Sequence, residues 1–248
     1  MEKPTLVGTH LDCPELRVDF FSPHKVSRRF LLGLRVLGLV SSTYFVFMRL
    51  WIPMAGSFPM YCYMTVWGNF AAVVYFWVIV ALSFLPQQKG HTLSSITPFF
   101  RFLHILFQLC VGSLFVICLM FWGFLLPQMN KMLGQHPEFA QEILVYCVGT
   151  HLIVPFQIWL ESYLNHVGFR ARDGVVWLPI VAVIYSGLNY YWTVSYGKPV
   201  YLPMDWTSIS TPIFLGAAFG LAGLGFYFAK ALWLWKHGEP TESKKKTT

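Results

Sequence analysis

Six long apolar runs constrain the fold of this chain more than any other feature. They cover residues 30–52, 61–85, 99–126, 143–163, 175–195 and 211–235. A helix needs about 20 apolar residues to cross the hydrocarbon core of a bilayer, and each run meets that length. Residues that interrupt helices lie between the runs, at Pro53, Pro86, Pro127, Gly168, Gly174, Gly197, Pro199 and Pro203. The sequence therefore predicts an all-α fold, a polytopic bundle of six transmembrane helices.

Composition supports this class and suggests three parts. Charged residues make up 12% of the chain, whereas a soluble domain has about a quarter. The six runs define a membrane domain over residues 30–236. We expect residues 1–29 to form a cytoplasmic N-terminal segment and residues 237–248 to form a basic cytoplasmic tail.

Lysines and arginines are unevenly distributed between the two sides of the predicted bundle. The loops on one side hold only Lys131 and Lys198. The other side holds Lys3, Arg17, Lys25, Arg28, Arg29, Lys89, Arg101, Arg170, Arg172, Lys236, Lys244, Lys245 and Lys246. Because cytoplasmic loops carry the excess of positive charge, both termini are expected in the cytoplasm. The net charge of +7 has the same explanation, and no nucleic-acid motif accompanies it.

The C-terminus indicates an internal membrane. The chain ends Lys-Lys-Thr-Thr, which resembles a dilysine retrieval signal of endoplasmic-reticulum membrane proteins. The alternative is a solvated basic tail that only holds the last helix in place. We therefore expect the endoplasmic-reticulum membrane, with the mitochondrial inner membrane as the alternative.

Cysteine spacing gives no sign of a metal site. Cys13, Cys62, Cys110, Cys118 and Cys147 form neither a CxxC pair nor a Cys/His pattern. All but Cys13 lie in or beside apolar runs, where a thiol behaves as a small hydrophobe. We expect no metal and no cofactor.

Several ionisable residues lie within the predicted spans, and most have structural explanations. Long side chains near helix ends reach the interface, which accounts for Arg35, Arg49 and Lys230. Glu161 lies at a depth similar to that of Arg35, so an ion pair between them is expected. His104 lies close to the cytoplasmic face and is interpreted as interfacial.

His151 is different because it lies deeper, about 12 Å from the luminal end of the fourth span. Pro155 removes the hydrogen bond to the His151 carbonyl and should bend the helix beside the imidazole. A freed carbonyl at this depth must be satisfied by protein or by a water-filled cavity. This arrangement hints at a cavity around His151, although a buried histidine is more often a packing residue.

Thr65 lies in the same half of the bilayer, on the second span. A helix threonine usually bonds a carbonyl of its own helix. Beside a histidine that removes its proton, however, the hydroxyl becomes a nucleophile. Asn69, one turn along, could orient the base or donate to an oxyanion.

With these residues in place, the chain resembles the androgen-induced-gene family of multi-pass hydrolases, which cleave fatty acid esters of hydroxy fatty acids. Residues 63–67 (Tyr-Met-Thr-Val-Trp) are similar to the segment that bears the family's nucleophilic threonine. Residues 149–156 (Gly-Thr-His-Leu-Ile-Val-Pro-Phe) are similar to the element with its catalytic histidine. A third stretch continues through residues 170–174 to Val200-Tyr201-Leu202-Pro203. The resemblance implies Thr65 as nucleophile and His151 as general base, in a serine-hydrolase-like reaction on a lipid ester.

The resemblance has one departure. In the family, the catalytic histidine lies one residue further from the Pro-Phe pair than His151 does, so Thr150 occupies the equivalent position in strict register. One helix residue is about 100° of rotation, which local rewinding near Pro155 could absorb. His166 also matches a family histidine, but it belongs to the cytoplasmic loop after the fourth span.

Three functions fit these patterns to different degrees. The first is an intramembrane lipid esterase that uses Thr65 and His151, with membrane lipids and a lipid ester as its partners. The second is a non-catalytic accessory subunit of a larger membrane complex that has borrowed the fold. The third, a transporter, is weaker because no internal repeat is evident. Whether Thr65 and His151 converge distinguishes the first from the second.

Overall fold

The structure is a computed structural model, and it describes residues 26–51, 60–84, 97–135, 137–165 and 167–237. The predicted N-terminal segment up to residue 25, with Cys13, lies outside the described residues, and so do Lys89, His166 and the Lys-Lys-Thr-Thr tail. Within the described part the chain is helical and contains no strand. The all-α prediction is therefore confirmed.

Among the residues that the structure describes, six stretches are long and apolar enough to cross a membrane, as predicted. The first two are α2 (Arg28–Trp51) and α3 (Met64–Phe84). The last two are α8 (Ala171–Tyr196) and α9 (Ser210–His237). The third span is α4 (Thr97–Met120), which continues through a π-helical turn into α5 (Leu126–Gln135). The fourth is built from α6 (Ala140–Val148), a second π-helical turn and α7 (Val154–Leu164).

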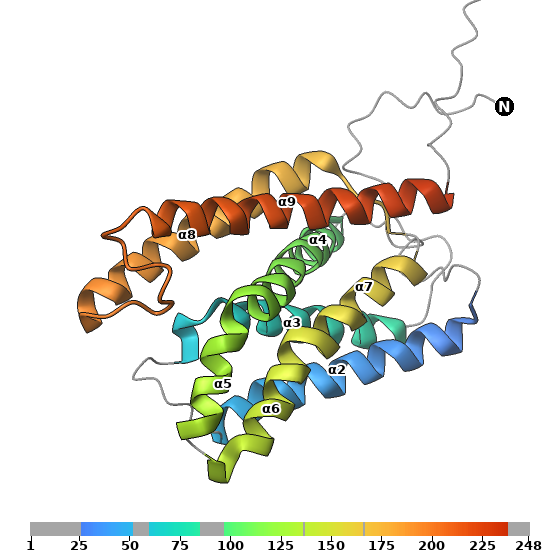
Figure 1. Ribbon diagram of the computed structural model, residues 1–248. Helices are drawn as coiled ribbons and strands as arrows, with labels where there is room; N and C mark the ends of the chain where they lie inside the picture. The colour runs from blue at the N-terminus through green and yellow to red at the C-terminus, as the bar shows by residue number, and fades with distance from the viewer. Residues whose placement is uncertain (1–25, 52–59, 85–96, 136, 166, 238–248) are drawn as a thin grey trace, which may run out of the picture.

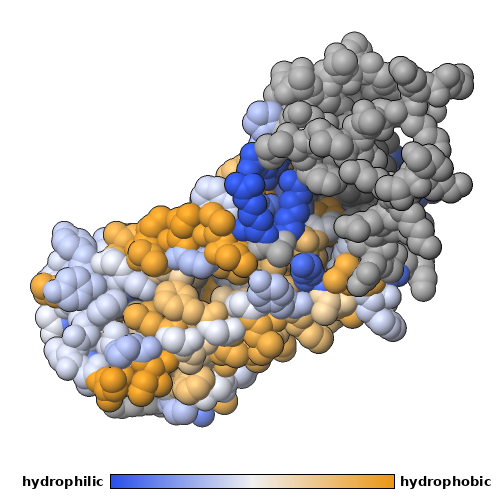
Figure 2. All heavy atoms as spheres, turned by 90° about the horizontal axis from the view of Figure 1, so that it is seen from above, coloured by the Kyte–Doolittle hydropathy of each residue, from blue (hydrophilic) through white to orange (hydrophobic). Residues whose placement is uncertain are grey.

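Helix α4 lies at the centre of the bundle, where it packs against α3, α7, α8 and α9 (Figure 1). Helix α2 lies on the outside, against α3 and α7. In the third and fourth spans 56% of the apolar window is buried, against 17% in the last two. Helices α8 and α9 consequently present most of their apolar side chains outward, and apolar side chains cover much of the face in Figure 2. Such a surface suits hydrocarbon rather than water.

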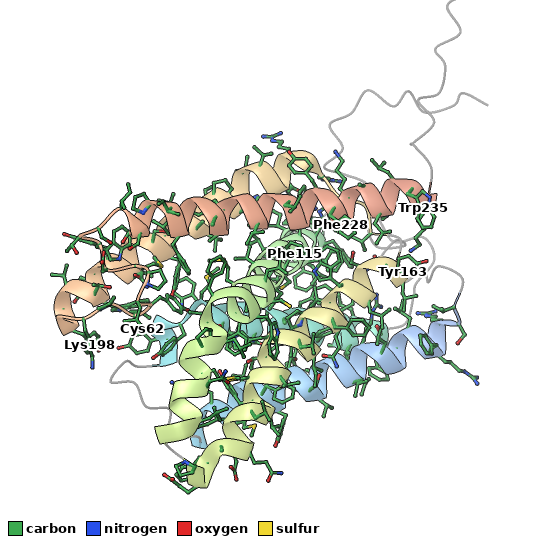
Figure 3. The ribbon with its side chains drawn as sticks, in the orientation of Figure 1. Cys62, Phe115, Tyr163, Lys198, Phe228 and Trp235 are labelled. Carbon is green, nitrogen blue, oxygen red and sulfur yellow. The ribbon has the colours of Figure 1, made fainter. Side chains whose placement is uncertain are left out.

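Helix α9 approaches the Phe115 ring of α4 closely because Gly225 of α9 has no side chain. A Cβ at Gly225 would lie 2.5 Å from this ring, so only glycine fits at that position on α9. Figure 3 shows Phe115 beneath α9 and Phe228 further along the same helix. The indole of Trp159 on α7 packs against both rings, with centroid distances of 5.3 Å to Phe115 and 5.8 Å to Phe228. These aromatic contacts join α4, α7 and α9.

Basic residues gather at one end of the bundle. The starts of α2, α4 and α8 and the ends of α3, α7 and α9 meet there (Figure 1), and Figure 2 shows strongly hydrophilic side chains toward that end. The described residues that carry this charge are Arg28, Arg29, Arg101, Arg170, Arg172 and Lys236. The ammonium group of Lys236 donates to the backbone carbonyls of Tyr163 and Asn165, which ties the end of α9 to the end of α7.

The ion pair expected between Arg35 and Glu161 is confirmed. Two guanidinium nitrogens of Arg35 donate to Glu161 Oε1, Nη2 at 2.6 Å and Nε at 2.9 Å. The Tyr75 hydroxyl and the Asn165 side-chain amide donate to the same oxygen, at 3.0 Å and 3.3 Å. Both charged side chains are fully buried. We call these four residues the Arg35–Glu161 cluster.

His104 is buried inside the protein, near the end of the bundle where the basic residues gather. Its side chain is 1% exposed. One ring nitrogen lies 2.7 Å from the Gly168 carbonyl and the other 3.5 Å from an Asp173 carboxylate oxygen. These partners belong to the start of α8 and the loop before it, so His104 fastens α4 to that loop.

Candidate active site

The third and fourth spans each contain a π-helical turn, and the two turns meet at His151. The turns cover Phe121–Leu125 and Gly149–Ile153. Each ends two residues before a proline, Pro127 in one span and Pro155 in the other. A helix proline leaves a carbonyl without its usual donor, and a π-turn is one way for the helix to adapt. Turns of this kind occur frequently at functional sites.

The carbonyl that Pro155 frees is satisfied by protein. The indole nitrogen of Trp122 donates to the His151 carbonyl at 3.2 Å. The neighbouring Phe121 ring stacks on the imidazole, with centroids 3.6 Å apart and planes 15° apart. The sequence had hinted at a cavity around His151, whereas this face of the ring is closely packed. The donor that the bent helix requires comes from the opposite π-turn, so water is not needed there.

Thr65 and His151 converge. Thr65 Oγ1 lies 3.1 Å from His151 Nε2. On the other side of the ring, His151 Nδ1 lies 2.9 Å from the Cys147 carbonyl oxygen. A carbonyl can only accept, so Nδ1 carries the proton and Nε2 is left to accept from the threonine hydroxyl. This is the tautomer that a general base requires.

His151 and not Thr150 faces the threonine. The Thr150 hydroxyl donates to the Tyr146 carbonyl at 2.8 Å and lies 2.9 Å from His151 Nδ1, where it can also accept the imidazole proton. The helix is rewound at this point, as the register of the resemblance requires, and the rewinding takes the form of the π-turn. Gly149 makes room for it, because the Phe45 ring of α2 lies where a Cβ would be.

Asn69 ties the two halves of the pair together. Its side-chain nitrogen donates to the Thr65 carbonyl at 2.7 Å and to the Thr150 carbonyl at 3.4 Å. Its side-chain oxygen is buried without a hydrogen-bond partner. In this arrangement Asn69 orients the backbones of α3 and the π-turn, which favours the first of its two expected roles over donation to an oxyanion.

Thr65 lies in the first turn of α3, where two tyrosines meet the start of the helix. The Met64 amide donates to the hydroxyls of Tyr185 and Tyr201, at 3.1 Å and 3.0 Å. Tyr185 in turn donates to the Cys62 carbonyl at 2.8 Å. Burial raises the pKa of Tyr201 to about 12, so this hydroxyl stays protonated. The first turn of a helix also carries positive potential that favours a developing anion.

Cys62 is the cysteine nearest this helix start, and it is a poor alternative nucleophile. Its side chain is fully buried, and burial raises the pKa of the thiol to about 11. Because the thiolate is the reactive form, a thiol of this pKa is inert near neutral pH. Figure 3 shows Cys62 and Lys198 near the end of the bundle opposite Tyr163 and Trp235.

A cavity of about 230 Å³ lies beside Thr65, between α3, α4, α8 and α9. Almost all of its wall is apolar, and Thr65, Tyr185 and Tyr201 are among the few polar residues that line it. His151 does not line it, so the threonine lies between the base and the cavity. Within the described ranges, no group of three or more His, Cys, Asp or Glu side chains is arranged to hold a metal ion.

Sequence reasoning found Thr65, His151 and Asn69, and the structure brings all three together. It missed Phe121, Trp122, Tyr185 and Tyr201. The prolines that follow the π-turns were a usable signal for the first two, whereas nothing local indicated that two tyrosines far along the chain would reach the start of α3. No protein-family model matches this chain, and comparison with curated proteins and with solved structures finds no match.

Proposed function

We propose that this protein is an intramembrane lipid esterase in which Thr65 is the nucleophile and His151 the general base. The observation that carries the proposal is the 3.1 Å contact between Thr65 Oγ1 and His151 Nε2, with Nδ1 oriented by the Cys147 carbonyl. A nucleophile, a base and a group that orients the base are the three parts of this chemistry. Fatty acid esters of hydroxy fatty acids are the substrates that the family resemblance implies.

The reaction has two halves. Thr65 Oγ1 attacks the ester carbonyl carbon while its proton moves to His151 Nε2. The tetrahedral intermediate collapses, Nε2 gives that proton to the leaving alcohol oxygen, and the acyl group stays on Thr65. Water then gives a proton to Nε2 and attacks the acyl carbon; the second intermediate collapses, Nε2 returns the proton to Thr65 Oγ1, and the acid is released. The Cys147 carbonyl and the Thr150 hydroxyl hold Nδ1–H while the ring is charged.

Negative charge on the attacked carbonyl oxygen needs donors fixed in advance. Two groups beside Thr65 can supply them. One is the first turn of α3, with its positive potential. The other is the Tyr201 hydroxyl, which accepts from the Met64 amide, is hydrogen-bonded to the Tyr185 hydroxyl, and can turn its proton toward the ester oxygen. Tyr185 is less suited, because its own proton is bound to the Cys62 carbonyl.

The orientation of the bundle is part of the proposal. The basic end would face the cytoplasm with both termini, and the Thr65–His151 pair would lie in the opposite half of the bilayer. The Lys-Lys-Thr-Thr tail would then be available to a cytosolic retrieval machinery and would keep the protein in the endoplasmic reticulum.

A second function, an accessory subunit of a membrane complex, is favoured by one observation. The imidazole is stacked under Phe121 and only 5% exposed, so its bond to Thr65 would also serve as a structural link between α3 and the fourth span. Catalytic assays separate the two functions.

The test is hydrolysis of a fatty acid ester of a hydroxy fatty acid by purified protein. We expect activity in the wild type and its loss in Thr65→Ala and His151→Ala. Thr43→Ala on α2 is the matched control, since it removes a buried hydroxyl that makes no hydrogen bond to Thr65 or His151. Full activity in Thr65→Ala or His151→Ala would refute the assigned roles. An inactive wild type, tried with several lipid esters, would favour the structural function.

A further inference from the structure

The cavity beside Thr65 is elongated along the bundle. On α4 its lining residues run from Leu106 to Met120, which is 14 residues, or about 21 Å at 1.5 Å per residue. On α9 they run from Phe214 to Ala222, about 12 Å by the same rise. A volume of about 230 Å³ spread over such a length makes a narrow slot and not a round chamber.

The two ends of this slot differ in polarity. Thr65, Tyr185 and Tyr201 lie at the end nearest His151, together with Ser186, whose hydroxyl is buried without a partner. Ser113, part-way along, already donates to the Leu109 carbonyl of its own helix. The far end is lined by Ala71, Leu106, Leu109, Leu178 and Ala222. An occupant therefore needs one polar end and a long apolar body.

We infer that the slot holds the unbranched acyl chain of the ester, with its carbonyl at Thr65 and its methyl end toward Leu106, Leu178 and Ala222. The inference rests on the proposed function for the placement of the carbonyl, and on the shape and polarity of the cavity for the rest. The acid half of the substrate is thereby distinguished from the alcohol half, which must lie outside the slot.

The volume sets a length. A cavity of about 150 Å³ with an apolar lining holds benzene, which has six carbons. In proportion, 230 Å³ accommodates about nine carbons, since 230 × 6/150 is roughly nine. Each methylene that enters an apolar slot should raise kcat/KM about fourfold. We expect this gain to continue to about nine carbons and to stop there, because a longer chain no longer fits in the slot with its carbonyl at Thr65.

The experiment measures kcat/KM for unbranched acyl esters from two to eighteen carbons, on the full chain in lipid nanodiscs. Ala222→Phe places a ring in the far end of the slot, and Gly220→Phe places the same ring in open space on the same helix. We expect Ala222→Phe to move the break to shorter chains and to lower kcat/KM for the ten-carbon ester at least tenfold. The two-carbon ester should stay within twofold of wild type, which also shows that the variant is folded. Gly220→Phe should keep the wild-type profile.

A second readout does not depend on catalysis. A ten-carbon fatty acid with a diazirine at its methyl end is photolysed in the Thr65→Ala variant, and the labelled peptides are identified. Labels on α4, α8 or α9 near Leu106, Leu178 and Ala222 support the slot even if no hydrolysis is ever found. Thr65-dependent hydrolysis with labels elsewhere, or with a chain-length profile that Ala222→Phe leaves unchanged, would overturn the slot while the esterase proposal stands.

Discussion

Two of the polar clusters buried in this apolar bundle are built in opposite ways. In the Arg35–Glu161 cluster, donors from α2, α3 and the end of α7 converge on one carboxylate oxygen. Between Thr65 and His151 there is a single hydrogen bond, and the threonine borders a cavity. The first cluster joins helices through charge, whereas the second leaves a hydroxyl with a base on one side and open space on the other.

The backbones that carry these two groups also differ. Glu161 lies in a regular stretch of α7, but His151 lies in a π-turn that faces a second π-turn. Irregular helix is costly unless its surroundings fix it, and here Trp122, Phe121 and Asn69 do so. The comparison teaches that burial and polarity alone do not mark a reactive site. A reactive side chain also needs open space where a substrate can bind and a base held in a fixed position beside it.

The largest expected effect is on the reaction itself. Thr65→Ala should lower kcat at least 10³-fold, because removal of a nucleophile leaves only the remaining transition-state contacts. Thr65→Ser keeps the hydroxyl and should retain activity within about tenfold. The thermal midpoint of both variants should stay close to that of the wild type, since one hydrogen bond contributes about 1 kcal/mol. Steady-state kinetics and a thermal unfolding curve on the same samples make the check.

Substitutions in the Arg35–Glu161 cluster should lower stability and leave activity nearly unchanged, the reverse of the Thr65 variants. Glu161→Ala leaves a buried guanidinium without its carboxylate and should lower the free energy of unfolding by about 3–5 kcal/mol. Activity per folded molecule should change less than threefold, because Glu161 takes no part in the chemistry. Arg35→Met combined with Glu161→Leu should recover part of the stability. A stable Glu161→Ala variant with little activity would invert the comparison.

Tyr201 is expected to affect the rate and Tyr185 the fold. Tyr201→Phe removes an oxyanion donor and should lower kcat about 10²-fold with a smaller change in KM. Tyr185→Phe removes a hydroxyl whose proton is bound to the Cys62 carbonyl, so kcat should fall less than fivefold. Equal losses in the two variants would show that both tyrosines only position the start of α3.

Trp122 should have a moderate effect on stability. Trp122→Phe leaves the His151 carbonyl without a donor in a buried position and should lower the free energy of unfolding by about 1–3 kcal/mol. Trp77→Phe on α3 is the matched control, because the Trp77 side chain is exposed. If the two variants unfold alike, the carbonyl has found another donor and the π-turn does not depend on Trp122.

The smallest effect concerns the loop before α9. Backbone amides of Thr207 and Ser208 donate to Asp205 and hold the pKa of its carboxyl at about 2, below its usual value. A lowered pKa in the folded state means that Asp205 contributes stability above about pH 4 and loses it as the pH falls toward 2. Asp205→Ala should therefore melt slightly below the wild type at pH 6, and the gap should narrow at pH 3. An equal gap at both pH values would show that charge is not involved.

The sequence predicted the six spans because span length and loop composition are local properties. The Arg35–Glu161 pair was also predictable, since a charge at membrane depth needs a partner and only a few residues lie at the matching depth. Thr65 and His151 were paired on depth and on the family resemblance. Their contact distance could not be predicted, because it depends on how the second and fourth spans pack.

The π-turns show where prediction from sequence stopped. The helix continues through both Pro127 and Pro155, and a π-turn comes just before each of them. Pro179 also lies inside a helix, α8, but no π-turn comes before it. Whether a helix forms a π-turn before a proline depends on the hydrogen-bond donors that other helices can offer to the freed carbonyl. For His151 that donor is Trp122, from a different span. Such a partner is a property of the tertiary structure.

The most direct test of the central claim is to trap the acyl-enzyme. Purified protein is mixed with excess p-nitrophenyl decanoate, quenched with acid within one turnover, and analysed by intact mass and then by peptide mass. The account predicts one added decanoyl group, carried by Thr65, in the wild type and none in Thr65→Ala or His151→Ala. A decanoyl group on another residue, or steady hydrolysis that survives in Thr65→Ala, would contradict it.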